Sequence, residues 1–199
     1  MRAITVYCSS SPQLDPVFHE VASSLGKMMA ENGLELVFGG GSIGLMGEIA
    51  QSARDNGCRT VGIITERLLD REMGDQKCDE LIVVSTMRER RRLLMDRADA
   101  FIMLPGGIGT YEEFFEALVG RQLAEHRKPI GVVNVDGYFD PLLEMIRHGI
   151  EHRFIREATH SLMHIDSDPA VVLETLLTSD PASHDDESLL PVFTPGSGH

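Results

Sequence analysis

The sequence is poor in several residue types, and each shortage excludes a class of protein. It contains no tryptophan and only three cysteines, at Cys8, Cys58 and Cys78. Three is an odd number, and the spacing lacks the pairs that are typical of zinc sites or disulfide frameworks. We therefore expect reduced thiols and no bound metal.

Lysine is scarce as well, because only Lys27, Lys77 and Lys128 are present. A pyridoxal phosphate enzyme needs a lysine at its cofactor to form the Schiff base. By pattern, two of these lysines lie on the surface of a helix or loop. Lys128 precedes a strand at its amino end, which is the edge of a parallel sheet away from ligands. A pyridoxal-dependent decarboxylase is not expected.

Positive charge and long apolar runs are also missing. The formal net charge of −13 argues against a nucleic-acid partner, because phosphate backbones are bound by basic patches. No apolar stretch approaches the ~20 residues of a membrane helix. Residues 1–7 lead directly into a strand without the apolar segment of a signal peptide. We expect a cytoplasmic protein without a membrane segment.

Short apolar runs alternate with amphipathic segments along the chain. Six strands are predicted, at Ile4–Tyr7, Leu36–Phe38, Thr60–Ile64, Leu81–Val84, Ala100–Leu104 and Ile130–Val135. Helices are predicted at Pro16–Asn32, from Ser85 or Thr86 to Arg97, at Asp140–Glu151 and at Pro169–Leu177. Continuous apolar strands separated by helices indicate a parallel sheet that is covered on both faces. The fold class is α/β, a Rossmann-like doubly wound parallel sheet with helices on both faces.

The composition favours one domain. A chain of 199 residues with 42% hydrophobic residues can form one full core, but is too short for two ordinary domains. We assign residues 1–178 to a single nucleotide-binding catalytic domain. Residues 179–199 are rich in Pro, Ser, Gly and Asp, and we predict that this acidic tail is disordered.

The most informative segment is Pro105–Glu113, with the sequence PGGIGTYEE. It follows the apolar strand that ends at Leu104 and leads into a helix that contains Phe114 and Phe115. Three glycines allow close approach of a ligand, and a helix N-terminus offers unpaired N–H groups to a phosphate. A carboxylate one turn into the helix would lie beside the phosphorylated molecule. This arrangement predicts chemistry on a small phosphorylated compound.

A second glycine-rich segment, Gly39–Gly47, has the sequence GGGSIGLMG. It follows the strand at Leu36–Phe38 and precedes a helix that is predicted from Glu48 to Asn56. Two such turns at the carboxyl ends of parallel strands indicate a binding site at that edge. Cys8 ends the first strand there and could line the same pocket.

Four arginines lie in the predicted helix after Thr86, although the protein is acidic. Arg88, Arg91 and Arg92 are compatible with a solvated face that pairs with Glu89 or Asp96. At least one arginine at this edge could instead point into the pocket, where an anion would favour a bidentate donor. Spacing alone does not decide which one.

These two glycine segments together resemble the paired signatures of the LOG ("Lonely Guy") proteins, a family often labelled as lysine decarboxylases. The resemblance runs from Ile4 to about Leu177 and includes Met87-x-x-Arg90, Asp70–Glu72, Ala98–Ala100 and Asn134–Tyr138. The chain departs from the usual pattern at Ser9, where glycine is common, and at Arg91, where lysine is common. Either departure could change the choice of base or the width of the pocket.

The resemblance implies a cytokinin riboside 5′-monophosphate phosphoribohydrolase. Such an enzyme hydrolyses the N-glycosidic bond of a purine nucleoside 5′-monophosphate, AMP or a cytokinin riboside monophosphate, to free base and ribose 5-phosphate. By this similarity the catalytic pair is Arg90 and Glu113, no cofactor or metal is needed, and the protein is a homodimer with the site near its interface. We expect nucleotide or phosphate binding at Ser10, Gly41, Ser42, Gly44, Met46, Gly106, Gly107, Gly109 and Thr110.

The residues themselves are compatible with this chemistry. Cleavage of an N-glycosidic bond passes through an oxocarbenium-like transition state, which a nearby carboxylate stabilises. Glu113 suits that role. Arg90 could help the base to leave, bind phosphate or orient Glu113, but it is too weak an acid to donate a proton readily.

Two other readings stay open. Gly39, Gly41 and Gly44 fit the dinucleotide fingerprint, and Glu66 follows at the required distance. This pattern favours an NAD(P)-type oxidoreductase, but it leaves the second glycine segment unexplained. The third reading is a non-catalytic nucleotide sensor or carrier on the same fold. A pure binder would not need the carboxylate of Glu113 beside an anionic ligand.

Overall fold

The computed structural model describes residues 1–71 and 73–179, and its centre is one parallel sheet of seven strands. The strand order is β4-β3-β2-β1-β5-β6-β7, and every neighbouring pair is parallel. The strands are β1 (Ala3–Tyr7), β2 (Glu35–Phe38), β3 (Arg59–Thr65), β4 (Glu80–Val84), β5 (Ala100–Met103), β6 (Ile130–Val133) and β7 (Met163–Asp166).

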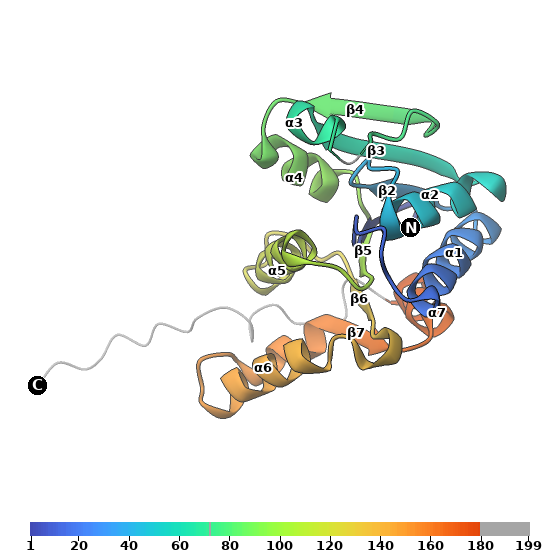
Figure 1. Ribbon diagram of the computed structural model, residues 1–199. Coiled ribbons are helices and arrows are strands. Elements are labelled where there is room, and N and C mark those ends of the chain that lie inside the picture. The colour runs from blue at the N-terminus through green and yellow to red at the C-terminus, as the bar shows by residue number, and fades with distance from the viewer. Residues whose placement is uncertain (72, 180–199) are drawn as a thin grey trace, which may run out of the picture.

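Helices cover both faces of the sheet (Figure 1). One face carries α1 (Pro16–Glu31), α2 (Gly44–Asp55) and α7 (Pro169–Thr178). The other carries α4 (Met87–Asp96), α5 (Ile108–Gln122) and α6 (Asp140–Glu151). The short helix α3 (Glu66–Leu69) follows β3, and two 3-10 turns lie at Val135–Gly137 and Glu157–Leu162.

The sheet separates two apolar cores, and alternate strand residues face each of them. Ile4 and Val6 of β1 pack toward α1, α2 and α7, whereas Tyr7 packs toward α4, α5 and α6. Both faces of the central strands are therefore buried, which accounts for their continuous apolar sequences.

The direction in which successive strands are added to the sheet reverses after β4, because β5 pairs with the free side of β1. Strands β2 to β4 are added successively on one side of β1, and β5 to β7 follow on the other. The loops after β1 and β5 therefore diverge at their carboxyl ends and open a crevice, which is where doubly wound folds bind ligands. This topology brings the Pro-Gly-Gly segment next to Ser9–Ser11.

The structure confirms the predicted fold class, all six predicted strands and the positions of the main helices. It corrects three details. Strand β7 and helix α3 were not expected, and α2 begins at Gly44 instead of Glu48. Residues 180–199 of the predicted tail lie outside the described residues. Within residues 1–71 and 73–179, no helix has the length and apolar character needed to span a bilayer.

Candidate active site

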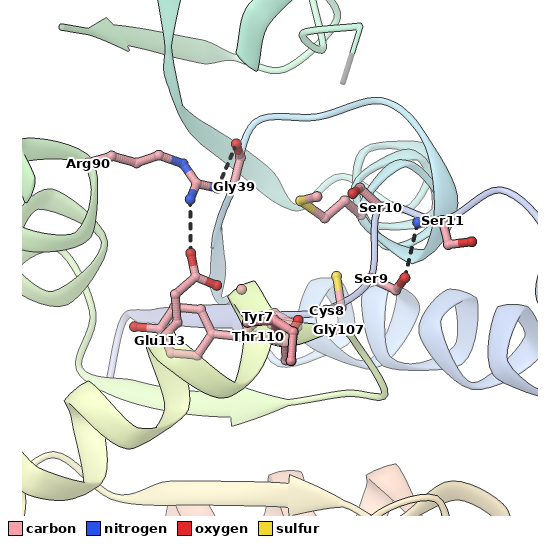
Figure 2. Close-up of a pocket in the computed structure, with 14 residues that line it drawn as sticks. Tyr7, Cys8, Ser9, Ser10, Ser11, Gly39, Arg90, Gly107, Thr110 and Glu113 are labelled. Carbon is pink, nitrogen blue, oxygen red and sulfur yellow. Dashed lines mark hydrogen bonds and ion pairs between the residues drawn. The ribbon is translucent and has the colours of Figure 1, made fainter. Parts of the chain in front are cut away.

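An open cavity of about 410 Å³ lies at the crevice between β1 and β5 (Figure 2). Its walls come from five places in the chain: the end of β1 and the following serines, the end of β2, the start of α2, helix α4 and the start of α5. The residues that line it are Val6, Tyr7, Cys8, Ser9, Ser10, Ser11, Gly39, Met46, Arg90, Gly107, Ile108, Gly109, Thr110 and Glu113.

Arg90 is the arginine of α4 that enters this cavity, and its side chain is buried. Its Nε donates to the carbonyl oxygen of Ile63 at 2.9 Å, and one terminal nitrogen donates to that of Gly39 at 3.2 Å. The other terminal nitrogen donates to Oε1 of Glu113 at 3.0 Å. Three acceptors from three different elements thus fix the guanidinium in one orientation.

Glu113 extends from the second turn of α5 toward Arg90 (Figure 2). Its side chain is only 12% exposed and that of Arg90 only 7%, so this ion pair is screened much less than a surface pair. Tyr7 lies beside it, and burial raises the pKa of its phenol well above the usual value, with the carboxylates of Glu113 and Glu116 acting in the same direction. The phenol is therefore neutral at physiological pH.

The start of α5 gives the cavity its anion-binding character. The first carbonyl to accept a helical bond is that of Gly107, from the N–H of Tyr111. The N–H groups of Ile108, Gly109 and Thr110 precede that bond, so they have no partner within the helix and carry its positive end. Gly106 does not line this cavity, but a side chain there would collide with Thr110, which is buried against it.

The first glycine segment packs closely against the loop that follows β1. Gly44 begins α2 with φ +62°, and a Cβ on it would lie 2.5 Å from the carbonyl oxygen of Ser11. The backbone N–H of Met46 donates to the carbonyl of Ser9 at 3.2 Å. This segment therefore supports the Ser9–Ser11 loop by close backbone packing.

The structure does not bring every candidate binding residue to the cavity. Ser10, Met46, Gly107, Gly109 and Thr110 line it, whereas Gly41, Ser42, Gly44 and Gly106 do not. Ser42 donates its hydroxyl hydrogen to the carbonyl of Met73 and lines a neighbouring hollow instead. Gly41 forms a bridge with Gly74. Three of these four residues belong to the first glycine segment, and Gly106 belongs to the second.

The other arginines of α4 lie on its outer surface. Arg91 pairs with Glu112 at 2.6 Å and with Glu116 at 3.2 Å, which ties α4 to α5. Arg92 pairs with Asp96 at 3.4 Å, as the spacing predicted.

Several residues that line the cavity were not predicted from the sequence. Tyr7 and Gly39 lie at strand ends and line the cavity beside Arg90 and Glu113. Tyr7 looks like ordinary strand sequence, and Gly39 was named only as part of the first glycine segment. Their position at the carboxyl edge was the available signal, and it identified Cys8 correctly as a pocket residue. Ser9 and Ser11 were visible as part of the same serine run.

In chemical terms, the cavity combines an anion site with a nearby carboxylate. Successive residues of a helix rise about 1.5 Å, so Glu113 lies about 8 Å along α5 from Ile108, the first residue of the helix. That separation fits a sugar 5-phosphate, with its phosphate at the helix start and its anomeric carbon near the carboxylate.

Comparison with known proteins gives a consistent picture. A family model described as possible lysine decarboxylase matches residues 46–176. The chain is 40% identical over 185 residues to cytokinin riboside 5′-monophosphate phosphoribohydrolase LOG2 of Arabidopsis thaliana, covering 93% of this chain and 86% of that protein. It is 43% identical over 156 residues to cytokinin riboside 5′-monophosphate phosphoribohydrolase LOG of Oryza sativa subsp. japonica, covering 78% of this chain and 64% of that protein.

Solved structures share the same architecture. The molybdenum cofactor carrier protein of Chlamydomonas reinhardtii matches with a TM-score of 0.68 at 22% identity, covering 89% of this chain and 99% of that chain. The molybdenum cofactor binding protein of Rippkaea orientalis matches with a TM-score of 0.67 at 23% identity, covering 88% and 95%. At such identities the likeness shows the common fold alone.

Proposed function

The chain belongs to the LOG family of cytokinin riboside 5′-monophosphate phosphoribohydrolases, and from this premise and its cavity we propose that it hydrolyses a purine nucleoside 5′-monophosphate. The N-glycosidic bond is cleaved, and the products are the free base and ribose 5-phosphate. The observation that carries this proposal is the buried Arg90–Glu113 pair, 3.0 Å apart, one turn beyond an open helix N-terminus.

In this proposal Glu113 acts on the anomeric carbon. Its carboxylate stabilises the positive charge that develops on the ribose as the base departs, or it activates the water that attacks the same carbon. Arg90 balances the charge of Glu113 and fixes its rotamer, because the guanidinium is itself held by Ile63 and Gly39. Each terminal nitrogen of the guanidinium carries a second N–H, which is available to the nucleotide.

The start of α5 binds the 5′-phosphate in this scheme. The N–H groups of Ile108, Gly109 and Thr110 supply hydrogen bonds and the positive end of the helix. Gly107 and Gly109 leave open space for the phosphate, since no atom lies within 4 Å of a Cβ built on either glycine. A nucleoside without phosphate would leave these donors unused, so the monophosphate is the expected substrate.

The positions of the lysines argue against a pyridoxal-dependent decarboxylase. Lys27 lies on α1 beside Glu31, and Lys77 is exposed in the loop before β4. Lys128 donates to the carbonyl of Met95 at 2.6 Å, at the amino edge of β6. None of the three, all within the described residues, lines the cavity.

The homodimer with a shared site is also part of the proposal. Three apolar side chains on α5 or directly after it are exposed: Ile108 by 83%, Val119 by 49% and Leu123 by 47%. Residues 11 and 15 positions apart share one helix face, and Ile108 lies at the rim of the cavity. A second copy packed on these side chains would reach the mouth of the site. Light scattering that gives a monomer mass at micromolar concentration, with full activity, would contradict this arrangement. The cytoplasmic location stays a prediction.

The experiment that tests the function is a substrate panel with chromatography of the released base. AMP and isopentenyladenosine 5′-monophosphate should be hydrolysed, and their relative rates identify the preferred base. GMP and CMP serve as controls for the choice of base, and adenosine as the control for the phosphate. If none of these monophosphates releases a base, the proposed function is wrong.

A further inference from the structure

The peptide between Gly106 and Gly107 is held by one side chain from a distant part of the sequence. The hydroxyl of Tyr138 donates to the carbonyl oxygen of Gly106 at 2.7 Å. Tyr138 follows β6, whereas Gly106 follows β5. A peptide flanked by two glycines rotates at low cost because neither residue has a Cβ to restrict it. An external hydrogen bond is therefore needed to keep it in one orientation.

This orientation determines where the neighbouring N–H group points. The peptide bonds described are trans, and a trans peptide directs its carbonyl and its N–H to opposite sides. With the Gly106 carbonyl bound to Tyr138, the N–H of Gly107 is directed away from Tyr138. Gly107 is the N-cap of α5 and lines the cavity that contains Arg90 and Glu113.

The turn that carries Tyr138 is unusually well fixed. Asp136 and Gly137 both adopt left-handed conformations, with φ of 49° and 69°. Such a conformation is uncommon for a residue other than glycine, as Asp136 is. The Asn134 side chain supports the turn by accepting the N–H of Phe139 at 2.7 Å. The Tyr138 ring also packs edge-on against Phe18 of α1 at 6.0 Å. These contacts place the hydroxyl over the Pro-Gly-Gly turn.

We propose that Tyr138 is a positioning residue for phosphate binding: its hydroxyl fixes the Gly106–Gly107 peptide so that the start of α5 presents its N–H groups to the ligand. The inference rests on the proposed function only for the identity of the anion, a sugar 5-phosphate. It predicts an effect on ground-state binding of the phosphate, because Tyr138 contacts the turn at Gly106 and does not line the cavity that contains Glu113.

The test compares Tyr138→Phe with a matched control, Tyr111→Phe. Tyr111 carries a hydroxyl 3.5 Å from that of Tyr138, at the outer limit for a hydrogen bond, and its ring packs beside the same aromatic cluster. Calorimetry measures the affinity of each variant and of the wild type for ribose 5-phosphate. Steady-state assays measure kcat and KM for AMP, and thermal melts control for stability.

Loss of one neutral hydrogen bond should weaken binding of ribose 5-phosphate by Tyr138→Phe about five- to tenfold. KM for AMP should rise by a similar factor, with kcat and the melting temperature nearly unchanged. Tyr111→Phe should stay within about twofold of the wild type in all four quantities.

Three results would overturn the inference: unchanged ribose 5-phosphate affinity in Tyr138→Phe, an equal loss in both variants, or no binding of ribose 5-phosphate by the wild type. Failure of the proposed function is a separate result. In that case the wild type binds ribose 5-phosphate, Tyr138→Phe weakens that binding, and no base is released from AMP.

Discussion

Replacing Arg90 by methionine should destabilise the protein strongly, although the new side chain is apolar and similar in length. The change removes the donors to Ile63, Gly39 and Glu113. It leaves a carboxylate that is only 12% exposed without its cation. Breaking a buried ion pair from one side costs about 3–5 kcal/mol. We therefore expect urea denaturation to give a free energy of unfolding lower by about 3–5 kcal/mol at pH 7.

A double-mutant cycle isolates the part of this cost that comes from the ion pair. Glu113→Gln retains an acceptor for Arg90, so its own cost should be about 1–2 kcal/mol. In the Glu113→Gln background Arg90→Met strands no buried carboxylate, so it should cost about 2 kcal/mol less than in the wild type. Two results would refute the claim that Arg90 balances the charge of Glu113: strictly additive changes in the free energy of unfolding, or a loss below about 1 kcal/mol for Arg90→Met alone.

Two further predictions test the loop support and the pH dependence. Gly44→Ala should lower the free energy of unfolding by about 2 kcal/mol or more because of the positive φ and the contact with Ser11. The control is Gly57→Ala, which should cost only about 1 kcal/mol, because Gly57 has φ +87° but no atom within 4 Å of its Cβ. Equal losses in the two variants would contradict the packing argument. Burial lowers the pKa of His126 below its usual value, and its ring accepts the N–H of Lys128 at Nδ1 in the neutral form. Because the folded state resists protonation, stability should be fully present above about pH 6.5 and fall as the pH drops toward the depressed pKa. Melts between about pH 7.5 and 5 should show a shallower decline in His126→Gln, and an identical slope would disprove this assignment.

Much of the fold was predictable because the apolar strands and amphipathic helices carry strong periodic signals. Strand β7 was missed because Met163–Asp166 is a half-buried edge strand that contains a histidine and an aspartate. Helix α3 is one turn long, too short for a periodic pattern to appear. Both lie at or near the borders of the sheet, where burial imposes the weakest constraint on sequence.

The candidate site was predictable in its chemistry but less so in its geometry. The second glycine segment leads to the open helix start, as expected, and Arg90 is the arginine that faces Glu113. The first segment has the same composition, yet its glycines serve close packing of Gly44 on Ser11 and a bridge between Gly41 and Gly74. Sequence cannot separate these two uses of glycine, because both require a missing Cβ. The role of Tyr138 was not predictable from the Asn134–Tyr138 motif, because its hydroxyl contacts Gly106, which lies 32 positions away in the chain.

The most direct test of the central claim is AMP hydrolysis by the wild type and by Glu113→Gln, with adenine and ribose 5-phosphate quantified together. The amide preserves the shape of the side chain but cannot stabilise an oxocarbenium ion. We predict equimolar adenine and ribose 5-phosphate from the wild type, and a rate at least about 10²-fold lower in Glu113→Gln with AMP still bound. Full activity of Glu113→Gln would remove this carboxylate from the reaction and contradict the account.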